Sequence, residues 1–144
     1  MDAAPVTVGR SVLRAGLAEK ATGGARYTAD LKRPGMLYAR LLRSPHPHAR
    51  VTVVDAAPAL RLPGVHAVLT HLDCPQARID ADLAVLDAEV RFVGDEVAAV
   101  AAESRALAED ALAAIRVQYE RLPAVFDAEE ALRPGAVGTK GERV

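Results

Sequence analysis

Two of the four histidines in this sequence lie close enough together to suggest metal binding. His46 and His48 occur in the string SPHPH, and on an extended chain a spacing of two residues places both imidazoles on the same side. A stable zinc site needs a third or fourth donor, so two ligands do not complete one. We therefore expect an exposed or hydrogen-bonded turn here and predict no metal site.

The other candidate metal donors lie near one another in the sequence, but nothing in the sequence places them near His46 and His48. They are His66, His71, Asp73 and Cys74. Without a CxxC companion, the single cysteine cannot form a conventional multi-cysteine metal site, and it excludes an internal disulfide. His71 and Asp73 are too close to Cys74 in sequence to favour the geometry that activates a thiolate. We interpret Cys74 as a core or loop cysteine, which is typical of a reducing compartment.

Paired carboxylates and a glycine pair offer two further kinds of chemistry. Adjacent carboxylates in a strand, such as Asp95-Glu96, point to opposite faces, whereas Glu129-Glu130 at a helix start favours the helix dipole. The Gly23-Gly24 pair lacks the GxGxxG and GxxxxGK spacings of phosphate loops. We therefore predict no catalytic and no cofactor-binding residue in this chain.

Composition excludes several classes of partner. The net charge is -1 and no cluster of Lys or Arg dominates any stretch, so nucleic acid has nothing to bind. The N-terminus does not resemble a signal peptide, and no run approaches the roughly 20 apolar residues that span a bilayer. Hydrophobic residues make up 51% of the 144 residues but aromatic residues only 3%. We expect a soluble cytoplasmic chain with a core of Ala, Val, Leu and Ile.

Strand-like segments alternate with turns along most of the chain. Ser44-Pro45-His46-Pro47 excludes a continuous helix between the first two strands, because each proline biases its predecessor away from helical angles. A short helix with Pro58 in its first turn precedes the third strand. The apolar residues of segment 73–89 show no clear period, so its secondary structure stays unassigned. The expected extended segments are 36–43, 50–55, 65–72, 90–93, 96–102 and 117–122.

The clearest helix follows the strand at 96–102. Ser104 is its expected N-cap, and Asp127 with Glu130 forms a capping box for a last short helix that ends at Leu132. The helix that Ser104 caps carries one apolar stripe, which consists of Leu107, Ala108, Ala111, Leu112 and Ile115. The pattern predicts an α+β fold with helices on a mixed sheet. We expect an N-terminal extension over 1–15, one domain over 16–133, and a tail or severed linker over 134–144.

Three strings resemble the xanthine dehydrogenase and aldehyde oxidase family. The first matches the opening of the α/β-hammerhead domain in the large, molybdenum-cofactor-binding subunit, through Lys20, Thr22, Gly23, Ala25, Tyr27, Asp30, Pro34 and Gly35. The second begins at LYARLLRSPHPH and the third at VRFVGDEVAAVAA. Tyr38, Pro47 and Glu96 depart from the residues usual in that family. The resemblance implies the hammerhead fold at the start of such a subunit.

The resemblance also implies what the complete enzyme does. Such enzymes hydroxylate aldehydes, purines or other heteroaromatics with water and a molybdopterin cofactor, and electrons pass to iron–sulfur clusters and often to FAD. The family's cofactor loops and catalytic glutamate lie in later domains, so no residue here inherits a catalytic role. The implied partners are the molybdenum-cofactor-binding domains or subunit, an iron–sulfur subunit and possibly an FAD subunit.

Three residues of the SPHPH region are the candidates for contact with such partners. They are Arg43, His46 and His48, although the same residues could instead stabilise the turn locally. Three hypotheses remain open at this point: an enzyme component, either a split subunit or a fragment; a free-standing binding or scaffold module; and a histidine-based metal protein.

Overall fold

The computed structural model describes residue 9 and residues 11–79 and 84–136, and it divides the chain into two compact units. The first unit is Met1–Pro34 and the second is Gly35–Val144. The predicted domain over 16–133 includes parts of both units, and its boundaries stay a prediction.

The first unit has little structure that could form a core. It contains helix α1, Leu17–Ala21, and a single 3₁₀ turn, η1, Thr28–Asp30. The Asp30 carboxylate accepts a hydrogen bond from the Tyr27 amide at 3.0 Å and so closes the start of this turn. None of the described residues in this unit is buried.

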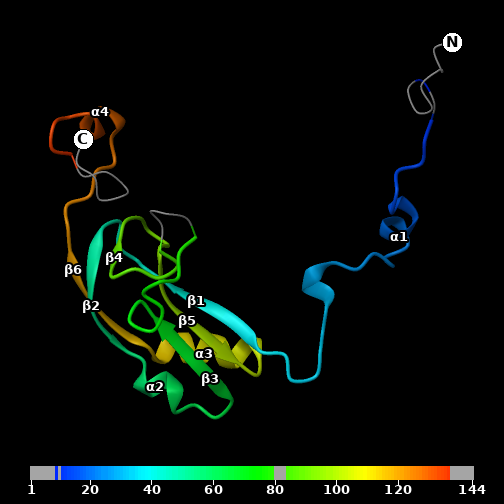
Figure 1. Cartoon of the computed structure of the whole chain (residues 1–144), viewed down its shortest axis with the longest axis horizontal. Helices are drawn as coiled ribbons and strands as arrows, with labels where there is room; N and C mark the ends of the chain where they lie inside the picture. Colours follow the sequence, from blue (N-terminus) through cyan, green and yellow to red (C-terminus); the bar gives the residue numbers. More distant parts are fainter. Residues whose placement is uncertain (1–8, 10, 80–83, 137–144) are drawn as a thin grey trace. The chain divides into compact units, whose positions relative to one another are not determined.

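The second unit contains two three-stranded sheets (Figure 1). One has the order β1-β5-β3 and the other the order β4-β2-β6, and all the strand pairs are antiparallel. The strands are β1 Tyr38–Arg43, β2 Ala49–Asp55, β3 Val65–Thr70, β4 Glu89–Val90, β5 Glu96–Ala102 and β6 Arg116–Arg121. The α+β class is confirmed, but the expected single mixed sheet is replaced by two antiparallel sheets.

The reason for this correction lies in the connections that contain helices. A parallel pair needs a crossover that returns to the same sheet. Here β2 leads through α2, Ala57–Leu60, to β3 in the other sheet, and β5 leads through α3, Arg105–Ala114, to β6 in the other sheet. Each strand–helix–strand segment therefore links the two sheets and creates no parallel pair within one.

The larger core lies between the β1-β5-β3 sheet and α3. Ala108 and Ala111 of the helix are fully buried, as are Ala98 and Ala102 of β5. Small side chains on both elements let helix and sheet approach closely, as the low aromatic content predicts. The predicted cap is confirmed, because the Ser104 hydroxyl accepts the Leu107 amide at 3.1 Å.

A smaller core supports the β4-β2-β6 sheet. It consists of Ala49, Val51, Val90 and Val97. The last short helix, α4, is Ala128–Ala131, and Asp127 caps it by accepting the Glu129 and Glu130 amides at 2.9 and 3.0 Å.

Part of the segment that the sequence left unassigned is a turn joined by one isolated bridge. Arg78 pairs with Ala84 in antiparallel sense, and residues 80–83 lie outside the described residues.

Candidate functional site

The elbow, defined as Ser44–Pro47, connects β1 of one sheet to β2 of the other. Ser44 is buried, and its hydroxyl exchanges hydrogen bonds with the backbone of His46 at 3.0 and 3.1 Å. Its own backbone pairs with the turn before β5, since its amide donates to Asp95 and its carbonyl accepts from Gly94, both at 2.8 Å. The start of the elbow is therefore fixed to the turn that leads into β5.

Arg43 strengthens the same junction from the end of β1. One guanidinium nitrogen donates to the Gly94 carbonyl at 2.6 Å and lies 2.7 Å from the Glu96 carboxylate. Asp95 lies between these two partners in sequence and accepts amides from Arg91 and Glu96. Burial raises the pKa of the Asp95 carboxyl, and the two amide hydrogen bonds oppose that shift.

The two histidines of the elbow region have different environments. The His46 ring meets the Tyr119 ring edge to face, with centroids 4.9 Å apart and planes at 83°. Burial raises the pKa of the Tyr119 hydroxyl. His48 is only 8% exposed, and its ring nitrogens face the Pro123 carbonyl and, at 3.2 Å, the Glu89 carboxylate. The ring of His48 thus links β2 to β4 and to the chain after β6.

The Glu89 carboxylate lies near two arginine side chains as well as near His48. Besides His48, its carboxylate lies 3.9 Å from Arg50 and 3.7 Å from Arg91. Arg91 also pairs with Asp87 at 3.1 Å. Sequence reasoning missed Glu89, because it lies at the end of the unassigned segment. It identified Pro123 only as the residue that ends the last strand, and not as a partner of His48.

Two of the other candidate metal donors, Asp73 and Cys74, lie in the turn after β3. The Asp73 carboxylate accepts both the amide and the hydroxyl of Thr70 at 2.8 Å, and Cys74 donates its thiol to the Thr70 carbonyl at 3.3 Å. The Thr70 hydroxyl and amide hold the pKa of Asp73 below its ordinary value. Asp73 and Cys74 are therefore both tied to Thr70, which supports a loop role for the thiol.

A metal centre is not assembled from these groups. Within the described ranges, no cluster of three or more His, Cys, Asp or Glu side chains could hold a metal ion. Two candidate donors remain. His66 pairs at the surface with Glu103 at 3.2 Å, and the Nδ1 atom of His71 is buried and makes no hydrogen bond with the described residues. None of the helices in the described part of the chain is long and apolar enough to cross a membrane.

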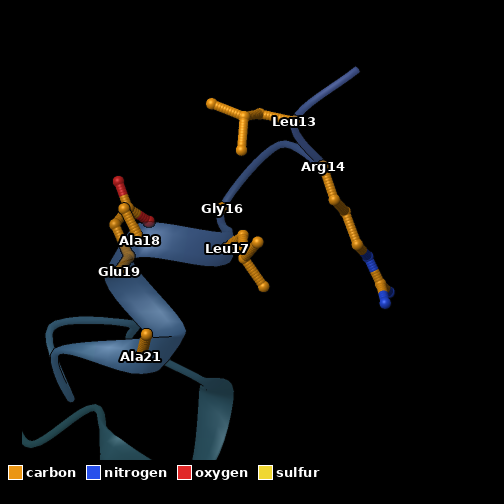
Figure 2. A pocket seen from close by; sticks show the side chains of 7 residues that line it. All are labelled: Leu13, Arg14, Gly16, Leu17, Ala18, Glu19 and Ala21. Carbon is orange, nitrogen blue, oxygen red and sulfur yellow. The ribbon is translucent and has the colours of Figure 1, made fainter. Parts of the chain in front are cut away.

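A hollow beside α1 belongs to the first unit (Figure 2). Its lining is mostly apolar, with the side chains of Leu13, Leu17 and Ala21. Arg14 and Glu19 are the charged residues that line it. Such a lining suits apolar contact better than it suits chemistry on a charged ligand.

The geometry defines a two-sheet α+β domain in which the candidate polar side chains bond mainly to the backbone and to charged side chains of the same domain. The family described as aldehyde oxidase and xanthine dehydrogenase, a/b hammerhead domain, matches residues 22–123. The chain therefore belongs to this family, which confirms both the resemblance and the hammerhead fold that the three strings indicate.

Individual relatives and solved structures agree with this assignment. A probable xanthine dehydrogenase subunit of Bacillus subtilis is 45% identical over 122 residues, which cover 81% of this chain and 16% of the relative. The carbon monoxide dehydrogenase large chain of Hydrogenophaga pseudoflava is 38% identical, over 79% of this chain and 15% of the relative. Quinoline 2-oxidoreductase from Pseudomonas putida has a TM-score of 0.79 at 42% identity, covering 86% of this chain and 17% of that one. The chain thus spans about one-sixth of the length of these relatives.

Proposed function

We propose that this chain is a structural and assembly domain of a molybdenum-cofactor-dependent oxidoreductase, and that other polypeptide completes the enzyme. The observation that carries the proposal is the family match over residues 22–123, in a chain that spans only about one-sixth of its relatives. A further relative, a nicotinate dehydrogenase large molybdopterin subunit of Eubacterium barkeri, is 35% identical over 140 residues, which cover 33% of that relative. The substrate class proposed for the whole enzyme is aldehydes, purines or other heteroaromatics.

Molybdopterin does not fit the residues described in this chain. The cofactor is anionic and needs many hydrogen-bond donors, whereas the hollow beside α1 is lined mostly by leucine and alanine. The donors of the elbow are already engaged, since Arg43 and Ser44 bond to the 94–96 turn. We therefore place the molybdenum cofactor, the iron–sulfur clusters and any FAD in partner polypeptides.

The surface supports assembly over a free-standing scaffold. A scaffold that functions alone should lack a large exposed apolar patch. In the second unit, Leu41 and Leu69 are both exposed and pair with the same residue, Ala99, of the strand between them.

The candidate interface residues fit this proposal to different degrees. Arg43 is exposed and His46 is half-buried, so both can contact a partner. The burial of His48 and its two partners favour local stabilisation of the turn. We also propose a cytoplasmic location, because a reducing compartment suits the single free thiol.

Purification of the tagged chain from its native host tests this function. We expect a large partner to co-purify, with molybdenum and iron measured in fixed ratio to the chain by elemental analysis. Repeated recovery of the chain alone would contradict the proposal. Stoichiometric metal in the purified chain alone would instead support the histidine-based metal protein.

A further inference from the structure

Neither phenylalanine of this chain contributes to its core. The chain has two phenylalanines and three tyrosines, and none of these five side chains is buried. Phe92 is 50% exposed and Phe126 is 82% exposed, whereas the buried apolar residues of the described chain are mostly Ala and Val. Single exposed apolar residues are common on protein surfaces, so the surroundings of each phenylalanine decide whether it indicates a contact.

Phe92 begins a short turn between β4 and β5, residues 92–95, which we call the anchor turn. The Asp95 amide donates to the Phe92 carbonyl at 3.2 Å and closes the turn. Gly94 has a φ of 99°, a positive value that the third position of a type II turn requires. Val93 is 63% exposed. Two adjacent large apolar side chains are thus exposed on one closed turn.

The anchor turn is fixed by hydrogen bonds from both sides. The Asp95 carboxylate accepts the amides of Arg91 and Glu96 at 2.8 and 3.1 Å. The backbone of Ser44 bonds to Gly94 and to Asp95, both at 2.8 Å. A group that is already ordered loses little conformational freedom when it binds. The two apolar side chains of the anchor turn are therefore presented on a preorganised backbone.

The charge around the anchor turn is negative. Residues 87–96 contain four carboxylates and one arginine. Arg43 of β1 pairs with Glu96 at 2.7 Å and Arg50 of β2 lies 3.9 Å from Glu89, so the carboxylates still outnumber the arginines. Such a surface repels anionic lipid headgroups and a second copy of the same turn. The occupant should therefore be apolar at its centre and basic at its rim.

We propose that Phe92 and Val93 insert into an apolar pocket with a basic rim on the cofactor-binding part of the molybdenum hydroxylase. This inference rests on the proposed function, because the relatives carry more than four-fifths of their length outside the region matched here. Arg43, an interface candidate, donates to the Gly94 carbonyl at 2.6 Å, so the candidate interface is continuous with the anchor turn. Aromatic side chains at the centre of an interface supply much of its binding free energy.

Co-purification from the native host tests the inference on the full tagged chain, expressed in place of the natural copy. Phe92→Ala is compared with Leu60→Ala, because Leu60 on α2 is equally exposed, at 50%, and lies outside the anchor turn. We expect Phe92→Ala to lower the molybdenum recovered per chain by about tenfold or more, because loss of a central aromatic anchor weakens binding on this scale. Leu60→Ala should recover as much molybdenum as the parent chain.

A labelling experiment leaves the aromatic ring in place. Val93→Cys is made in a Cys74→Ser background, with Leu60→Cys in the same background as its control. The rate of maleimide labelling is compared between the free chain and the molybdenum-containing complex. We expect labelling at position 93 to slow by about tenfold or more in the complex, because the centre of an interface excludes water, and labelling at position 60 to stay unchanged. If melts of the free chain show that Phe92→Ala does not fold, the labelling at position 93 decides alone.

The outcomes separate this inference from the proposed function. If the partner co-purifies equally well with Phe92→Ala, or if labelling slows equally at positions 93 and 60, the inference is wrong and the assembly function stands. If the parent chain recovers no molybdenum-containing partner, the proposed function fails and the inference fails with it.

Two further results would assign the anchor turn to another occupant and overturn the inference. One is slower labelling at position 93 when the free chain is concentrated, which would indicate a second copy. The other is binding of the free chain to phosphatidylglycerol vesicles that Phe92→Ala abolishes, which would indicate a membrane surface.

Discussion

His48 shows how a residue with catalytic chemistry serves structure here. A carbonyl and a carboxylate both accept hydrogen bonds, and the ring of His48 lies between the carbonyl of Pro123 and the carboxylate of Glu89. The side chain therefore joins three segments that are distant in sequence, which accounts for its burial.

Replacement of this histidine should cost stability. His48→Ala removes both hydrogen bonds and leaves a buried site, so we expect a loss of roughly 1–3 kcal/mol in the free energy of unfolding. His66→Ala is the matched control, because His66 pairs with Glu103 at the surface, where such a pair contributes about 0–1 kcal/mol. Urea denaturation of both variants measures the difference. Equal losses would show that His48 is no more structural than its surface counterpart.

Asp73 should make the stability depend on acid. Its pKa is lowered from 3.8 by the hydroxyl and amide of Thr70, so its contribution is present above pH 3.8 and is lost as the pH falls through the lower folded-state value. We expect Asp73→Ala to be less stable than the parent at neutral pH. The difference should disappear under strongly acidic conditions.

Thermal melts at a series of pH values measure the effect of Asp73. Thr70→Val removes the hydroxyl that donates to Asp73, so it should weaken the same acid dependence without removing the carboxylate. A stability difference between Asp73→Ala and the parent that persists unchanged at low pH would contradict the assignment.

Among the elements, the turn between α2 and β3 is constrained by its packing against α3. Gly64 has a φ of 88°, and a Cβ there would lie 2.8 Å from the Leu107 side chain of α3. Its carbonyl also accepts the Glu103 amide at 3.0 Å. The glycine thus serves both the left-handed turn and the close approach of α3.

A pair of glycine variants separates these two effects. Gly94 also has a positive φ, of 99°, but a Cβ there meets nothing within 4 Å. We expect Gly94→Ala to cost about 1 kcal/mol through backbone strain alone, and Gly64→Ala to cost roughly 1–3 kcal/mol more because of overpacking. Chemical denaturation compares the two. Equal costs would mean that Leu107 moves aside freely.

Local pattern was enough to predict most elements but not where each one ends. The apolar stripe and the Ser104 cap identify α3, and the apolar run from Glu96 to Ala102 identifies β5, because both signals depend on neighbouring residues. The predicted strand at 90–93 was wrong in extent. Within this segment, only Glu89 and Val90 pair with β2, because the partner strand decides where the pairing stops.

At the scale of the whole molecule, the sequence did not show how the strands divide between two sheets. That division depends on which strands pair across the chain, as β5 pairs with β1 and β3. The candidate site was predictable only in part. The histidines of the elbow region are visible in the sequence, but Glu89 and Pro123 become neighbours of His48 only through the fold.

The division into two units predicts how the chain tolerates truncation. All the buried apolar residues of the described chain lie between Ala49 and Ile115, in the second unit. Deletion of residues 1–34 should therefore leave cooperative unfolding of the remainder, with a change below about 1 kcal/mol. Circular dichroism melts of the full and shortened chains test this. Loss of the cooperative transition would show that the second unit needs the first.

The central position of β5 also sets an order of events during synthesis. β1 and β3 are complete by Thr70, but their shared partner begins only at Glu96, and β6, the main partner of β2, begins at Arg116. A nascent chain that ends before Glu96 therefore carries apolar strands whose hydrogen-bonding edges are unmatched. Such non-local pairing slows folding and leaves edges open to aggregation. The pairing of β1 and β3 therefore has to wait until β5 has been synthesised.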